Sequence, residues 1–125
     1  MKHYLLAAAI FLSPPFLASS CAADFTTPIV GLDGRGFTGP DGKPQDLTLG
    51  QVAENALTAA YPDEQTLSGV DKVKRFALAL KIHDHPDSTL SAEETTLLKT
   101  LIGKAYSTVI VGRAWTLLDP GSVPK

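Results

Sequence analysis

The sequence predicts a mostly α-helical single domain with an N-terminal β-hairpin-like arm and three or four helices. Length predicts the single domain, because roughly 100 residues remain once an export signal is set aside. Helix-capping residues precede apolar residues at helical spacing within residues 48–118, which predicts the helices. Glycine, proline and other turn residues gather in residues 24–47, which predicts the arm. Residues 119–125 are expected to form a loose tail.

Residues 1–23 have the layout of a cleaved secretory signal. Lys2 and the terminal amine form a short positive region, residues 4–12 are unbroken apolar, and small residues follow the Ser13–Pro15 helix stop. A membrane span would need roughly 20 apolar residues without such a break. We therefore expect export to the periplasm or envelope. The alternative is a misplaced start codon, in which case the protein is cytoplasmic.

The only cysteine, Cys21, lies where cleavage is expected. Cutting after Ala22 or Ala23 removes it with the signal. Cutting before it resembles processing of a bacterial lipoprotein, in which the thiol is acylated. Leu17 stands four residues before Cys21, where lipoprotein signals usually place leucine at three. We favour plain cleavage, keep Cys21 as a lipidation candidate, and expect membrane contact only if it is lipidated.

Charge argues against nucleic acid as a partner. The chain carries 11 Lys and Arg against 13 Asp and Glu, and these charges are interspersed. Nucleic-acid binding requires a positive stripe that neutralises phosphates, and the sequence has no basic block. The expected partner is a protein of unknown identity, and the sequence leaves the oligomeric state open.

The arm opens with an extended segment over Phe25–Leu32, which Pro28 would confine to a sheet edge. Asp33-Gly34 and residues 40–43 are turn signals. The three glycines Gly34, Gly36 and Gly39 match the dinucleotide fingerprint G-x-G-x-x-G. That motif needs a helix at its third glycine, and the prolines that follow directly prevent one. We expect a glycine-rich turn and no cofactor.

The first helix is expected to start at Thr48, which forms a capping box with Gln51. It is expected to end at Tyr61-Pro62, because a residue before proline disfavours the helical conformation.

The second helix is expected to start at Ser68 and to fray between His83 and Pro86. Apolar residues at helical spacing predict its buried stripe, namely Val70, Val73, Phe76, Ala77 and Leu80. Four cations are expected on its solvated face, namely Lys72, Lys74, Arg75 and Lys81. The alternative interpretation of these cations is a patch for an acidic partner.

A third helix is expected after Ser91 and Glu94, which form the clearest capping box in the chain. Its predicted buried face is Leu98, Leu101, Ile102 and Ala105. Gly103 weakens the helix interior and would mark close packing or an early end. Residues 107–118 fit a strand as well as a helix, and we predict helix. Tyr106 and Trp115 are expected in the core, with a role as partner anchors as the alternative.

One compact cluster of metal-ligand side chains is present, at His83, Asp84, His85 and Asp87. Two imidazoles and two carboxylates could hold Zn²⁺. Residues i and i+2 on a helix point apart, so the histidines could share a metal only in a loop. We expect no metal, and favour a helix end where a cation meets the negative end of the dipole. His83, His85 and Asp87 remain weak candidates.

The body of the chain resembles a group of small uncharacterised phage and prophage proteins. The similarity lies in short motifs, namely Phe25…Pro28-Ile29…Asp33-Gly34, Leu49…Val52…Asn55-Ala56-Leu57, Gly69…Lys72…Arg75…Leu78-Ala79…Ile82, residues 90–94, and Gly112…Trp115…Leu117-Leu118. The resemblance implies a compact, largely helical domain without known chemistry. Proteins of this group are usually cytoplasmic, so the signal-like segment is a departure from the group. If the signal is used, the resemblance fits a prophage gene that modifies the host envelope.

These observations lead to a small exported, non-enzymatic binding module of the bacterial envelope or periplasm. Export favours this hypothesis, as does the absence of a catalytic sequence motif such as G-x-S-x-G. A cytoplasmic phage accessory protein acting by protein contacts is the first alternative. A small metal-dependent enzyme using His83, His85 and Asp87 is the second.

Overall fold

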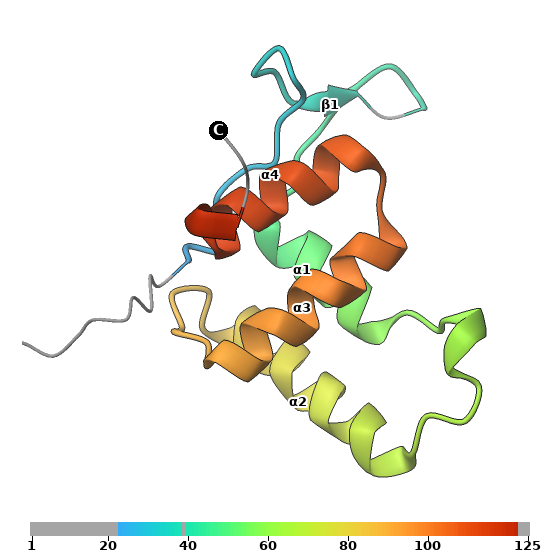
Figure 1. Cartoon of the computed structure of the whole chain (residues 1–125). Helices are drawn as coiled ribbons and strands as arrows, with labels where there is room; N and C mark the ends of the chain where they lie inside the picture. The colour runs from blue at the N-terminus through green and yellow to red at the C-terminus, as the bar shows by residue number, and fades with distance from the viewer. Residues whose placement is uncertain (1–22, 39, 123–125) are drawn as a thin grey trace, which may run out of the picture.

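The computed structural model describes residues 23–38 and 40–122, and this part of the chain is mostly helical. Four α-helices follow a two-stranded hairpin, as predicted (Figure 1). The helices are α1 (Leu49–Thr58), α2 (Gly69–Asp84), α3 (Ala92–Ala105) and α4 (Thr108–Leu118). No helix within these residues is both long and apolar enough to cross a membrane.

The hairpin of the arm is short and antiparallel. Its strands are β1 (Phe37–Thr38) and β2 (Pro44–Gln45), with Phe37 opposite Gln45. Gly34 takes a φ of 80° in the turn before β1, a conformation that favours glycine. Gly39 lies outside the described residues. A turn and a strand therefore follow the first two glycines of the G-x-G-x-x-G motif, and no helix does.

The start of the described chain is fastened to the helices. The Phe25 N–H donates to the Pro86 carbonyl just after α2 (2.9 Å), and the Gly50 N–H in α1 donates to the Phe25 carbonyl (2.8 Å). Phe25 and Ile29 are 2% and 1% exposed, so both belong to the hydrophobic core. Pro28 forms an isolated bridge with Thr48. The extended segment therefore closes one end of the helical bundle.

Helix α1 lies at the centre of the molecule, in contact with each of the other three helices. The capping box of Thr48 and Gln51 is present as predicted. The helix ends at Thr58, earlier than the predicted Tyr61. The Tyr61 hydroxyl folds back and donates to the Ala56 carbonyl, which satisfies one of the acceptors at the helix end.

Helix α2 begins after Ser68 as predicted, but the predicted buried stripe is wrong. Four of its members are largely exposed, with Val70 at 66%, Val73 at 65%, Phe76 at 59% and Leu80 at 46%. Ala77 is exposed as well. We call these five residues the outer face of α2. The buried side is instead formed by Arg75, Leu78, Ala79 and Ile82.

The error has a physical cause. Leu78, Ala79 and Ile82 also recur at helical spacing, so α2 carries two apolar faces and periodicity cannot say which one is buried. The inner face includes Arg75, which the sequence placed among solvated cations. Of those cations, Lys72 and Lys74 are exposed as predicted, whereas Lys81 is half-buried and pairs with Glu94 at 3.4 Å.

Helices α3 and α4 agree more closely with the sequence. The capping box of Ser91 and Glu94 is present, and residues 108–118 form a helix rather than a strand. Three predicted residues of α3 are buried, namely Leu98, Leu101 and Ile102. Ala105 is exposed, which corrects its placement. Gly103 does not end α3, and a Cβ there would meet Trp115 only at 3.8 Å, an ordinary contact.

The two aromatic residues of this region are half-buried and bonded to neighbouring helices. The Trp115 indole N–H donates to the Lys99 carbonyl (3.1 Å), and the Lys99 ammonium lies 4.6 Å from the centre of the Trp115 ring. The Tyr106 hydroxyl accepts from the Asn55 amide (3.0 Å). Residues 120–122 form a short 3₁₀-helix, η2, where a loose tail was predicted, and residues 123–125 lie outside the described chain.

Candidate functional site

The candidate site is a hollow of about 820 Å³ between the end of α1, the connection that follows it, and the first half of α2. The connection includes a short 3₁₀-helix, η1 (Pro62–Glu64), and swings outward from the bundle (Figure 1). Pro62 has a fixed φ suited to the first turn of a helix, which positions η1 directly after the extended Tyr61. We call this space the α1–α2 hollow.

Much of the wall is apolar. The apolar side chains come from both helices and the connection, namely Leu57, Ala59, Ala60, Pro62, Leu67 and Phe76. Phe76 also belongs to the outer face of α2, so the apolar lining continues onto the outside of that helix. The volume lies in the range of small-ligand pockets, roughly 300–1,000 Å³.

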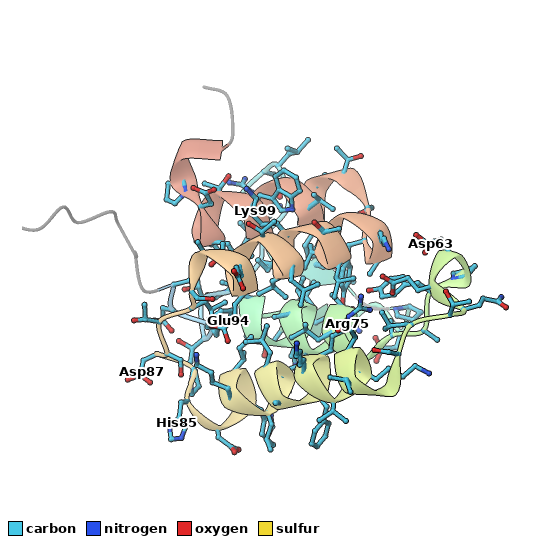
Figure 2. The ribbon with its side chains drawn as sticks, turned by 60° about the horizontal axis from the view of Figure 1, so that its bottom comes forward. Asp63, Arg75, His85, Asp87, Glu94 and Lys99 are labelled. Carbon is cyan, nitrogen blue, oxygen red and sulfur yellow. The ribbon has the colours of Figure 1, made fainter. Side chains whose placement is uncertain are left out.

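A two-pronged ion pair forms one side of the hollow. The Arg75 guanidinium donates to both oxygens of the Glu64 carboxylate, at 2.7 and 2.8 Å. Figure 2 shows Arg75 on α2 and Asp63 on the outward-swinging connection. The pair joins residues 11 apart in sequence, and so holds η1 against α2.

Lys104 of α3 extends this ion pair into a network. Its ammonium lies 3.2 Å from Glu64 and 2.9 Å from Asp63. Hydrogen bonding to Arg75, opposed by burial and reinforced by Lys104, lowers the pKa of Glu64 from 4.5 to about 2. Hydrogen bonding to Asp63 raises the pKa of Lys104. These charged groups therefore stay ionised and bonded to one another at neutral pH.

Tyr61 completes this wall. Its hydroxyl donates to the Ala56 carbonyl, and the Lys104 ammonium lies 5.1 Å from the centre of its ring. Burial raises the pKa of Tyr61, so the phenol stays protonated at neutral pH. A general acid or base works best with a pKa near the operating pH. The pKa values of Tyr61 and Glu64 are both shifted away from neutral pH.

Lys72 is the other cation on the wall. It is exposed, and no ion pair joins it to another described residue. Arg75 and Lys104, by contrast, already have carboxylate partners. The hollow therefore combines an apolar lining with one cation that is available to a ligand.

The predicted metal candidates lie at the opposite end of α2. His83 is bonded through Nδ1 to Glu54 at 2.9 Å. His85 forms the C-cap, with its backbone N–H donating to the Lys81 carbonyl, and Asp87 lies in the turn beyond. Figure 2 shows His85 and Asp87 pointing outward rather than toward a common centre. Among the described residues, no three His, Cys, Asp or Glu side chains are placed to hold a metal ion.

The ion pair and the tyrosine were not found from the sequence. Glu64 and Arg75 belong to different elements, and no local pattern links them. The sequence pattern marks Tyr61 only as the end of a helix. A signal did exist, since an arginine within an apolar helix, preceded by acidic residues in a proline turn, is consistent with a buried ion pair.

The lipidation candidate, Cys21, lies outside the described residues, as does the whole expected signal apart from Ala23. No protein-family model, curated protein or solved structure matches the chain.

Proposed function

We propose that this protein is a non-enzymatic binding module whose ligand site is the α1–α2 hollow. The observation that carries the proposal is an apolar-lined hollow of about 820 Å³ whose wall continues onto an exposed apolar helix face. Exposed apolar patches of this kind mark interaction sites in many soluble proteins. The paired state of Glu64, Arg75 and Lys104 supports binding rather than catalysis, because these charges already satisfy one another.

A dye titration tests the hollow as a binding site. The probe is 8-anilinonaphthalene-1-sulfonate, an apolar anion whose fluorescence rises when it leaves water. Ala60→Trp fills the hollow from an exposed position, and Phe76→Ser removes an apolar group from its wall. We expect the folded protein to bind the dye and each variant to reduce the fluorescence gain at least fivefold.

The matched control is Leu32→Ser. Leu32 is 84% exposed and does not line the hollow, so its replacement should leave dye binding unchanged. Equal dye fluorescence in the protein, Ala60→Trp and Phe76→Ser would contradict the proposal. Circular dichroism of each variant shows whether the helices are retained.

We also propose that the module is exported. Support comes from the signal-like layout of residues 1–23, and from the position of Phe25 as the first buried residue of the described chain. Cleavage after Ala23 would leave every described core residue in the mature protein. Lipidation at Cys21 would leave the same core and add an anchor.

Intact mass of the protein from its native host tests export. Loss of residues 1–23 or 1–22 indicates ordinary cleavage, and a mass beginning at Cys21 with added acyl groups indicates a lipoprotein. A full-length mass with Met1 retained, together with recovery in the cytosol, would contradict export. That result would favour the cytoplasmic accessory protein instead.

A further inference from the structure

We propose that the outer face of α2 and the α1–α2 hollow together bind an acidic amphipathic helical segment of a partner protein. This inference rests on the proposed function, because it names the ligand of the same site. Three features carry it: the shape of the apolar face, the position of the lysines beside that face, and the hollow at its edge.

The outer face of α2 has the shape of a helix-binding surface. Its four large members, Val70, Val73, Phe76 and Leu80, follow one another at spacings of three or four residues. They form a stripe roughly 15 Å long at 1.5 Å per residue. Helix-in-groove recognition uses anchors at the same spacing on the partner. A stripe of this length matches about three turns of a second helix.

Unpaired cations lie on both sides of the stripe. Lys72 and Lys74 are the chain neighbours of Val73, so the helical period turns one about 100° to each side of it. Both lysines are exposed and neither forms an ion pair with another described residue, whereas Lys81 pairs with Glu94. A partner segment with carboxylates beside its apolar residues would complement this arrangement.

The hollow supplies the anchor point. Phe76 belongs both to the stripe and to the wall of the hollow, and Lys72 lies on the same wall. A large apolar side chain projecting from a partner helix could enter the hollow beside Phe76. A carboxylate one turn away on that helix would then face Lys72. Interface energy often concentrates in such desolvated anchors.

A second copy of the chain fits this face less well. A two-fold pair would place the same surface against itself. The stripe flanked by Lys72 and Lys74 would then meet another stripe flanked by lysines.

A lipid surface fits less well too. A flat membrane would leave the hollow unfilled. A helical segment can instead place one apolar side chain in the hollow beside Phe76.

Selection from a phage-displayed library of random 16-residue peptides tests the inference directly. We expect the enriched peptides to combine Glu or Asp with Leu, Ile or Phe at helical spacing. A synthetic copy of the most enriched peptide should bind at least tenfold more weakly to Phe76→Ser. It should also bind at least tenfold more weakly to the double variant K72E/K74E, and its affinity for the original protein should fall with added salt.

Matched controls distinguish binding at the outer face of α2 from binding to exposed residues elsewhere on the protein. Leu32→Ser and Lys43→Glu alter an exposed apolar residue and an exposed cation away from α2, and should bind the peptide as the original protein does. The milder variant K72Q/K74Q removes the charge without reversing it, and should give an intermediate loss. Circular dichroism shows whether each variant keeps its helices.

Four outcomes would overturn the inference. In the peptide selection, these are a library with no enriched peptides and an enriched set of basic peptides. The other two are binding to phosphatidylglycerol vesicles and dimer formation in sedimentation equilibrium, where either one depends on Phe76. If Ala60→Trp still reduces the dye fluorescence gain at least fivefold in any of these cases, the hollow remains a binding site and only the partner is wrong. If Ala60→Trp and Phe76→Ser leave dye binding unchanged, the proposed function fails as well.

Discussion

Arg75 is the one charged residue in the buried set of the described chain, at 8% exposed. Its guanidinium is planar and presents parallel donors, which match the two oxygens of Glu64. Taking a charge out of water is costly unless hydrogen bonds replace those of water. In the described part of the chain every buried side-chain nitrogen and oxygen atom has a partner, so this condition is met.

Replacing Arg75 should therefore destabilise the fold. Arg75→Lys keeps the charge but loses the two-pronged geometry, and should lower the free energy of unfolding by about 1–2 kcal/mol. Arg75→Ala also leaves Glu64 without its main partner, and should lower it by about 3 kcal/mol. Urea unfolding followed by the fluorescence of Trp115 measures both. Lys74→Ala is the control, and should change the free energy of unfolding by no more than about 0.5 kcal/mol. If Lys74→Ala destabilised the protein as much as Arg75→Ala does, the role of the ion pair would be contradicted.

The same pair makes part of the stability depend on pH. The pKa of Glu64 is lower in the folded protein, about 2 against an ordinary 4.5. The ionised Glu64 carboxylate therefore stabilises the folded state above pH 4.5. This contribution to the free energy of unfolding is lost as the pH falls from 4.5 to below 2. The original protein should exceed Glu64→Gln in urea midpoint at pH 6, and the difference should shrink by pH 2.5. A difference that is as large at pH 2.5 as at pH 6 would contradict the contribution of Glu64.

At the level of single elements, three helices begin at a serine but only two of these serines cap through their side chains. Ser68 and Ser91 accept hydrogen bonds from the backbone N–H groups of Asp71 and Glu94, at 3.1 Å in each case. Ser107 stands at the same position before α4 and makes no such bond. The three serines therefore differ in what they contribute, although their positions are alike.

This difference gives a matched pair of substitutions. Ser91→Ala removes a cap and should lower the free energy of unfolding by about 1 kcal/mol. Ser107→Ala removes no bond, and should change it by less than about 0.5 kcal/mol. Thermal unfolding by circular dichroism compares the two. Equal losses would show that the caps do not distinguish these helices.

Helix starts could be predicted from the sequence because capping is local chemistry. Thr48, Ser68 and Ser91 each bond to a residue three positions ahead, and that spacing is visible in the chain. The buried face of α2 could not be predicted, because it depends on which side meets α1. Both sides of α2 carry apolar residues, so only the tertiary contacts decide.

The candidate site could be predicted only in fragments. Lys72 was recognised as exposed, and an acidic partner for the cations of α2 was an alternative interpretation. The hollow itself arises from the outward course of residues 59–67 between two helices, which no local pattern specifies. The His83, His85 and Asp87 cluster was compact in sequence, but the helix end directs its side chains apart.

At the scale of the whole molecule, α1 is the element around which the others pack. Ala53 and Ala56 are fully buried, and small side chains there let neighbouring helices approach closely. Ala56→Leu adds volume to a filled space and should lower the free energy of unfolding by about 1–3 kcal/mol. Ala105→Leu, at an exposed position of α3, is the control and should have little effect. Guanidinium unfolding measures both, and similar values would contradict the central place of α1.

The N-terminal segment closes the fold at one end, which sets a limit on truncation. A chain that begins at Asp24 should unfold at the same temperature as a chain that begins at Ala23. A chain that begins at Gly31 lacks two core side chains, Phe25 and Ile29. Replacing one core side chain of this size with alanine typically lowers the free energy of unfolding by about 2–5 kcal/mol. It should lose cooperative unfolding in calorimetry. Retention of a sharp transition would show that the segment is dispensable.

The two apolar faces of α2 have a consequence for how the chain reaches one structure. A helix that is apolar on both sides could dock on α1 in either of two rotations, one burying Leu78, Ala79 and Ile82 and the other burying Val73, Phe76 and Leu80. In the second rotation Arg75 would turn away from Glu64, and both charges would lose their partner. The ion pair between Arg75 and Glu64 therefore favours the first rotation of α2. In that rotation the larger apolar face, which includes Phe76, stays exposed to solvent.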